Sequence, residues 1–175
     1  ERRAPFDSDT NNFKHIHELI VEHADIPGCN VHPMPVDQED AADLYDAELR
    51  EHRAIGGVPG GPDRGRLDFV LLGMGPDGHI ASLFPDMLDN ADAFSLRAPP
   101  QILTTDAKGN PLLPRITMNL AMLTNCQALL LLVKGAEKKA LIEEVRGEAV
   151  AAPQRYPVGM LLAQSKKTVQ LCMLD

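Results

Sequence analysis

The sequence lacks the features that mark membrane and secreted proteins. No apolar run approaches the roughly 20 residues that span a bilayer, and the first residues do not form a secretory signal pattern. The chain has 175 residues, 44% of them hydrophobic and 24% charged, as in ordinary globular proteins. We therefore expect one domain over residues 1–175, with no membrane contact and a cytoplasmic location.

Positive charge is also scarce, since the formal net charge is −8. This balance disfavours general binding to nucleic acids or anionic membranes, which need basic surfaces. It does not exclude a small anion, because a pocket needs only two or three local cations. The three cysteines, Cys29, Cys126 and Cys172, show no CxxC or Cys/His metal spacing. We expect reduced, mostly buried thiols without a catalytic role, and no metal site.

Helical and strand patterns alternate along the chain. Amphipathic spacing predicts helices from Asn12 to Ala24 and over 38–52, the second with Asp37 as its N-cap. Short or apolar runs predict strands at 29–32, 67–72, 128–134 and 168–175. Residues 54–65 have the composition of a surface loop, and the section up to Pro114 is expected to be loop-rich. Further helices are expected near 117–125 and from Ala136 to about Arg146.

The two central strands, "LDFVLL" and "ALLLLVK", are nearly continuous apolar runs. Such runs are typical of strands covered on both faces in a parallel sheet. The alternation therefore predicts an α/β fold with a mainly parallel, Rossmann-like sheet and helices on both faces. Ligand sites in such sheets lie beyond the C-terminal ends of the strands.

A glycine-rich turn, "GMGPDGH", follows the first of these strands directly. Gly73, Gly75 and Gly78 allow a sharp turn and close approach to a ligand. The turn is not a dinucleotide fingerprint, because it contains a proline and no acidic residue ends a following strand. His79 is suited to proton transfer near neutral pH, and Asp77 is placed to orient its ring. The alternative is a loop histidine that only bonds to the backbone.

Three cations stand near predicted element ends. Arg115 precedes an expected helix start in "PRIT", Lys138 lies in the first turn of the helix that follows "ALLLLVK", and Arg2 stands in "ERRAP". Arginine and lysine bind phosphate as a planar fork and a point charge, respectively. The alternative is that each is an ordinary solvated cation, since spacing alone does not show that they converge.

Several segments together resemble one family. "LDFVLLGMGPDGHIASLFP" resembles the signature of the 6-phosphogluconolactonases, which share a superfamily with the glucosamine-6-phosphate deaminases. "ERRAPFDSDTNN", "NVHPMPV", "PRIT", "GAEK" and "VQLCMLD" are similar to further segments of the family, in the family's order. The deaminases continue "DGHIA" with an Asn-Glu-Pro segment, whereas this chain continues with Ser82-Leu83-Phe84-Pro85, which lacks the acid.

The resemblance implies roles for individual residues. His79 matches the family's general base, and Arg2, Arg115 and Lys138 match its phosphate-binding cations. Asn12 matches an asparagine of the opening motif, whose usual Ser-Asn pair is Asn11-Asn12 here. The family's Gly-Gly-Ser-Thr phosphate loop has no match. The resemblance therefore implies the C-terminal two-thirds of the family fold, without its N-terminal strands and with an open sheet edge.

The implied reaction is hydrolysis of 6-phospho-D-glucono-1,5-lactone in the oxidative pentose phosphate pathway. His79 would activate water, Asp77 would position the ring, and N–H groups of the Gly73–Gly78 loop would stabilise the oxyanion. No cofactor is expected. Three alternatives stay open: a deaminase-like isomerase, a non-catalytic sugar-phosphate-binding module, and one half of a fusion, for instance with glucose-6-phosphate dehydrogenase.

Overall fold

The computed structural model describes residues 1–52, 66–147, 155–165 and 169–174. The expected loop at 54–65 lies outside the described residues. The helices are α1 (Asn12–Leu19), α2 (Ala41–Glu51), α3 (Ala91–Phe94), α4 (Leu120–Thr124), α5 (Ala136–Gly147) and α6 (Pro157–Gln164). The strands are β1 (Leu67–Gly73), β2 (Ile102–Lys108), β3 (Leu113–Met118), β4 (Cys126–Lys134) and β5 (Val169–Leu174). Among these residues, no helix is both long and apolar enough to cross a membrane.

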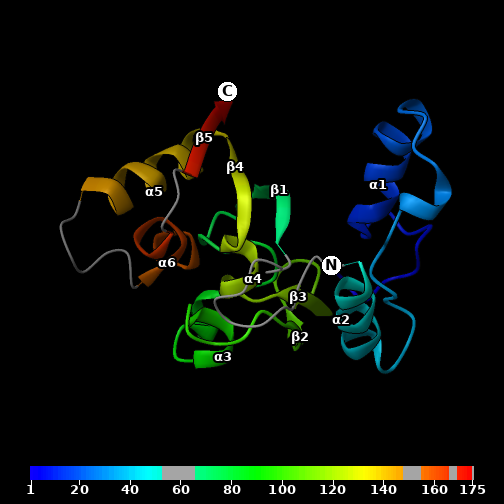
Figure 1. Cartoon of the computed structure of the whole chain (residues 1–175). Helices are drawn as coiled ribbons and strands as arrows, with labels where there is room; N and C mark the ends of the chain where they lie inside the picture. Colours follow the sequence, from blue (N-terminus) through cyan, green and yellow to red (C-terminus); the bar gives the residue numbers. More distant parts are fainter. Residues whose placement is uncertain (53–65, 148–154, 166–168, 175) are drawn as a thin grey trace.

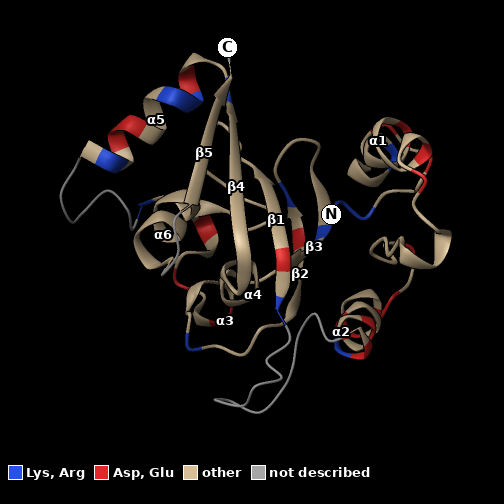
Figure 2. Ribbon diagram, turned by 45° about the horizontal axis from the view of Figure 1, so that its top comes forward, with Lys and Arg blue, Asp and Glu red and all other residues tan. Residues whose placement is uncertain are grey.

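The centre of the molecule is a parallel sheet with the strand order β1-β4-β5. It confirms the predicted α/β architecture with a parallel sheet. Figure 1 shows α5 and α6 on one side of this sheet, and α1 and α2 on the far side of the molecule. Figure 2 shows that β4 and β5 carry few charged residues, whereas charges gather on α1, α2 and α5.

One face of the sheet is packed and the other is partly open. Alternate residues of β1 and β4 form a buried core with α3, α4, α5 and α6, including Val70, Leu72, Leu129 and Leu131. On the opposite face of β1, the side chains of Phe69 and Leu71 are 55% and 51% exposed. The expectation that this strand is covered on both faces is therefore wrong, and in the described residues the helices that join this core pack on one face. An apolar run alone does not report which neighbours cover it.

The section expected to be loop-rich contains an antiparallel hairpin, β2-β3. Leu113–Met118 is a strand, so the helix expected near 117–125 is shortened to α4 and Arg115 lies within β3 rather than before a helix. Helix α2 packs on this hairpin through a second core that contains Tyr45, Leu49, Ile102 and Ile116. The hairpin was missed because its prolines and polar residues interrupt the apolar pattern.

The N-terminal third differs from the predictions in three places. Helix α1 ends at Leu19, and a separate 3₁₀ turn covers Val21–His23. The expected strand at 29–32 is wrong, because Gly28–Asn30 forms a 3₁₀ turn. The N-cap of α2 is Asp40 rather than Asp37, so the helix begins at Ala41.

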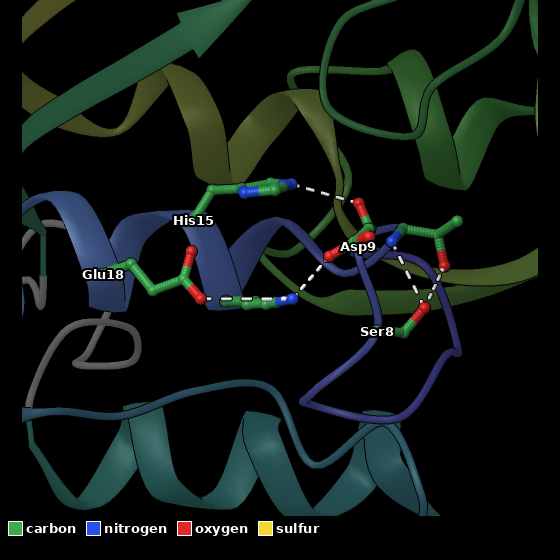
Figure 3. A network of polar contacts seen from close by, with 6 residues as sticks. Ser8, Asp9, His15 and Glu18 are labelled. Carbon is green, nitrogen blue, oxygen red and sulfur yellow. Dashed lines mark hydrogen bonds and ion pairs between the residues drawn. The ribbon is translucent and has the colours of Figure 1, made fainter.

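The start of α1 is fixed by polar contacts from the preceding turn (Figure 3). The Asp9 carboxylate pairs with Lys14, and the Asp9 carbonyl accepts a hydrogen bond from His15 Nε2 at 3.0 Å. Ser8 Oγ lies 2.8 Å from Thr10 Oγ1. The Asn11 side chain accepts from the Phe13 N–H and so caps the helix. These contacts set where the helix begins.

All three cysteines are reduced thiols. Cys126 is buried in β4 and Cys172 is half-buried in β5, as expected. Cys29 is exposed in its 3₁₀ turn, so the prediction of burial fails for this residue.

Candidate active site

The turn after β1 presents Asp77 and His79 at the C-terminal edge of the sheet. Gly75 N–H donates to the His79 carbonyl at 2.9 Å, and Gly78 N–H donates to the Gly75 carbonyl at 3.1 Å. Gly78 has a φ of +80°, a conformation that L side chains rarely adopt. The turn is therefore closed by its own backbone hydrogen bonds, and His79 leaves it in a fixed direction.

The imidazole of His79 is oriented by Asp77. Its Nδ1 lies 2.6 Å from Asp77 Oδ1, and the same oxygen accepts the His79 backbone N–H at 3.2 Å. The His79 side chain is 26% exposed. With Nδ1 held by the carboxylate, Nε2 is the nitrogen left to exchange a proton with a ligand.

The three glycines of this turn have different structural roles. A Cβ at position 75 would lie 2.2 Å from both Nδ1 and Cε1 of His79, so only glycine fits there. A Cβ at Gly78 would approach the Tyr156 ring at 3.1 Å. A Cβ at Gly73 would meet nothing within 4 Å, so close approach does not require glycine at that position.

The backbone N–H groups of Gly75 and Gly78 already donate within the turn. The expectation that these two groups stabilise an oxyanion is therefore wrong, because neither donor is available to a ligand without opening the turn.

The Phe84 ring lies against both His79 and Arg115. The rings of His79 and Phe84 are 4.5 Å apart between centroids and tilted by 33°. The Arg115 guanidinium lies over the Phe84 ring, with its Cζ 5.2 Å from the ring centroid. Sequence reasoning read the segment around Phe84 only for its lack of an acid. The signal it missed is an aromatic residue five positions after the histidine.

Arg115 is buried and held by backbone carbonyls. Its Nε and Nη2 donate to the Lys108 carbonyl at 2.9 and 2.8 Å, and Nη2 also donates to the Pro111 carbonyl at 3.0 Å. An arginine has five N–H donors, so this arrangement leaves the two on Nη1 for a ligand. Burial, with a further contribution from the Arg2 charge, lowers the pKa of Arg115.

Arg2 lies beside Arg115 because the first residues pair antiparallel with β3. Arg2 Nη1 donates to Asn12 Oδ1 at 2.9 Å and to the Thr10 carbonyl at 3.0 Å. The buried Arg2 Nε has no hydrogen-bond partner among the described residues. Two guanidinium groups this close repel each other, and an anion between them would relieve that repulsion.

One cavity of about 810 Å³ brings most of the predicted residues together. Its lining includes Arg2, Asn12, Gly73, Gly75, His79, Arg115 and Lys138. Asp77 and Gly78 do not line it and act behind His79 instead. The convergence of the three cations, which spacing alone did not show, is therefore a property of the fold.

The cavity brings cationic side chains and an imidazole together. Three cations face the same space as an imidazole whose Nδ1 is held by a carboxylate. Apolar side chains, among them Phe69 and Leu71 of β1, line the remaining wall. Among the described residues, one group of histidines and carboxylates has metal-like spacing, namely His32, Glu48 and His52, and of these His32 lines the cavity. The cavity therefore suits a negatively charged ligand that reacts by proton transfer.

Comparison with known proteins points to one family. The family model described as glucosamine-6-phosphate isomerases/6-phosphogluconolactonase matches residues 1–170. A 6-phosphogluconolactonase of Thermotoga maritima is 34% identical over 149 residues, which are 83% of this chain and 59% of that protein. The Homo sapiens GDH/6PGL endoplasmic bifunctional protein is 30% identical over 97% of this chain and 20% of its own length.

A crystal structure of 6-phosphogluconolactonase from Thermotoga maritima superposes with a TM-score of 0.77 at 28% identity, covering 100% of this chain and 70% of that one. The chain thus spans about 59% of the length of the first of these relatives. With a family match over almost its whole length, the chain belongs to the glucosamine-6-phosphate isomerase/6-phosphogluconolactonase family.

Proposed function

We propose that the protein containing this chain hydrolyses 6-phospho-D-glucono-1,5-lactone to 6-phosphogluconate. The observation that carries the proposal is that His79 shares one cavity with Arg2, Arg115 and Lys138. Relatives that are 6-phosphogluconolactonases by name support the substrate class. If the cations bind the phosphate, they hold the lactone ester within reach of the imidazole. The ester and the base then react within one complex instead of meeting by diffusion.

In the proposed step, His79 Nε2 accepts a proton from water as the water oxygen adds to the lactone carbonyl. The bond between that carbon and the ring oxygen then breaks, and the imidazolium returns the proton to the departing oxygen. Asp77 acts as the positioning residue, since its carboxylate holds Nδ1 at 2.6 Å and stabilises the transient imidazolium. Water is the co-reactant, and the step needs no cofactor.

The segment after Ala81 bears on the choice between lactonase and deaminase chemistry. Ser82 to Pro85 contain no acid. The Glu1 carboxylate lines the cavity, but it accepts hydrogen bonds from the backbone N–H groups of Arg2 and Phe13. This favours lactone hydrolysis over a ring-opening isomerisation, which needs an acid at the sugar ring.

The test is lactone turnover by the full natural protein and its His79→Ala variant. Loss of the base should reduce kcat by about 10²–10⁴-fold, whereas His23→Ala, an exposed histidine outside the cavity, should leave it unchanged. Turnover at the wild-type rate by His79→Ala would refute the assignment. Ammonia release from glucosamine 6-phosphate would indicate the deaminase instead, and binding of 6-phosphogluconate without turnover would indicate a binding module.

The remaining expectations are also proposals. The bifunctional Homo sapiens relative supports a fusion with, or functional coupling to, a dehydrogenase that supplies the lactone, such as glucose-6-phosphate dehydrogenase. Assignment to the oxidative pentose phosphate pathway follows from the proposed substrate. The reading of residues 1–175 as one lactonase domain and the cytoplasmic location stay predictions.

A further inference from the structure

Three potential metal ligands meet at the C-terminal end of α2. Glu48 and His52 are four residues apart, so they lie on the same face of the helix end. His32 faces them from the segment that follows the 3₁₀ turn at Gly28–Asn30. One ligand atom from each of the three lies within 4.8 Å of the others. In the described part of the chain, no other group of three histidine, cysteine or carboxylate side chains has such spacing.

The side chains already contact one another. His32 Nδ1 lies 2.6 Å from Glu48 Oε1, and the rings of His32 and His52 have centroids 4.4 Å apart. The His32 and Glu48 side chains are 31% and 36% exposed, and His52 is exposed, so an ion can reach them from solvent. The surrounding helix carries more acidic than basic residues (Figure 2), which favours a cation.

A neighbouring hydrogen bond fixes the backbone of one ligand. The Tyr45 hydroxyl donates to the His32 carbonyl at 3.1 Å, from one turn before Glu48 on α2. The backbone of His32 is therefore held in place, whereas the exposed His52 side chain is free to adjust its position. Outer contacts of this kind are typical of protein metal sites.

We propose that His32, Glu48 and His52 bind a divalent transition-metal ion, for which zinc is the best match. Two imidazoles and one carboxylate form a common three-ligand set for zinc, with water in the fourth position. Zinc–ligand bonds of about 2.0–2.2 Å in a tetrahedron place the ligand atoms about 3.4 Å apart. The His32 and Glu48 ligand atoms are now 2.6 Å apart, so zinc would replace their hydrogen bond and widen this pair, while rotation of the exposed His52 ring would bring in the third ligand.

The bound ion would link two parts of the molecule. His32, Pro33 and Met34 line the large cavity, whereas α2 packs on the β2-β3 hairpin. A bound zinc ion would therefore connect the cavity-lining segment 32–34 to α2. The site lies outside the groups assigned to lactone hydrolysis, so it stands or falls independently of the proposed function.

The experiment is a zinc titration of the metal-free full protein against a chromophoric chelator, without substrate. We expect one zinc ion per chain, with binding at least about 10-fold weaker in His52→Ala and Glu48→Gln. His17→Ala is the matched control, because His17 pairs with Glu22 at 3.1 Å and has no third potential ligand with such spacing in the described part of the chain. This variant should bind zinc like the wild type. His79→Ala should also retain the ion.

Two further readings guard against loss of folding as the explanation. His52 is exposed, so circular dichroism of His52→Ala should match the wild type. Zinc should raise the Tm of the wild type but not of His52→Ala, since only a folded site binds the ion. The proposal is overturned by no stoichiometric binding, by equal binding to folded His52→Ala, or by loss of the ion in His17→Ala or His79→Ala.

Discussion

At the scale of single residues, Gly75 has the strictest requirement in the candidate active site. Its missing side chain makes the space in which the His79 ring and the Asp77 carboxylate meet, since a Cβ would also lie 2.7 Å from Asp77 Oδ1. Sequence reasoning treated the glycines of this turn as equivalent. In the structure they differ: a side chain at Gly75 would collide with His79 and Asp77, whereas a Cβ at Gly73 would meet nothing within 4 Å.

We predict that Gly75→Ala reduces lactone turnover strongly while it changes the stability of the fold little. The added methyl group must displace the His79 ring, so lactone turnover should fall by about 10²-fold or more, as for loss of a general base. Gly73→Ala is the control and should keep near wild-type turnover. Steady-state kinetics gives the turnover of both variants, and thermal melting gives their stability. Wild-type turnover by Gly75→Ala would contradict the prediction.

The sequence was sufficient to place His79 at the C-terminal edge of the sheet, because a buried strand followed by a glycine turn brings the next polar residues to that edge. It was not sufficient to exclude the Gly75 and Gly78 N–H groups as oxyanion donors, since hydrogen bonds within a turn depend on its closure. Nor did it reveal the metal-like group, because His32 and Glu48 are 16 residues apart and meet only through the packing of α2.

At the scale of elements, the turn before α1 offers a test of how polar contacts fix a helix start. The Lys14 hydrogen bond and charge lower the pKa of the exposed Asp9 carboxyl. Because the folded-state pKa is the lower one, the contribution to stability is present above the ordinary value near 4. It is lost as the pH falls through the folded-state pKa.

The expected measurement is an NMR titration of the Asp9 carboxyl. Its pKa should lie below the usual range in the wild type and return toward it in Lys14→Met. Lys108→Met, which removes a lysine paired with Asp86 elsewhere on the surface, should leave the Asp9 value unchanged. An Asp9 pKa that does not respond to Lys14→Met would show that the ion pair is absent in solution.

Elements with long apolar runs were predictable, and those with mixed composition were not. β1 was located to within one residue and β4 to within two, because the run itself requires burial on at least one face. The β2-β3 hairpin contains Lys108, Pro114 and Arg115 and is held by pairing between strands, which no local pattern reports. The 3₁₀ turn at Gly28–Asn30 was mistaken for a strand, because the four residues 29–32 are too few to show a periodic pattern.

At the scale of the whole molecule, Asn119 joins segments that belong to different elements. It is fully buried, and its Oδ1 caps α4 by accepting the Met122 N–H at 2.9 Å. Its Nδ2 donates to the carbonyls of Asp92 and Pro99 at 3.0 and 2.9 Å. One amide thus ties α3, the segment before β2 and α4 into a single body.

Replacing Asn119 by alanine should destabilise the protein by about 2–4 kcal/mol, because it removes a helix cap and leaves buried carbonyls unpaired. Asn90→Ala is the matched control, since Asn90 caps the short α3 from an exposed position, and about 1 kcal/mol or less is expected there. Urea unfolding of both variants gives the two free energies. Equal losses would mean that burial of the Asn119 amide contributes nothing beyond capping.

The way the fold holds Arg115 has a consequence for the affinity of an anion at this residue. A free arginine side chain carries about 2 kcal/mol of rotamer entropy. Here three of its N–H groups are bound to the carbonyls of Lys108 and Pro111, so that entropy is lost when the chain folds rather than when an anion arrives. A phosphate bound as proposed would therefore meet two N–H groups on a side chain that is already ordered, and most of its attraction to Arg115 would remain available as affinity.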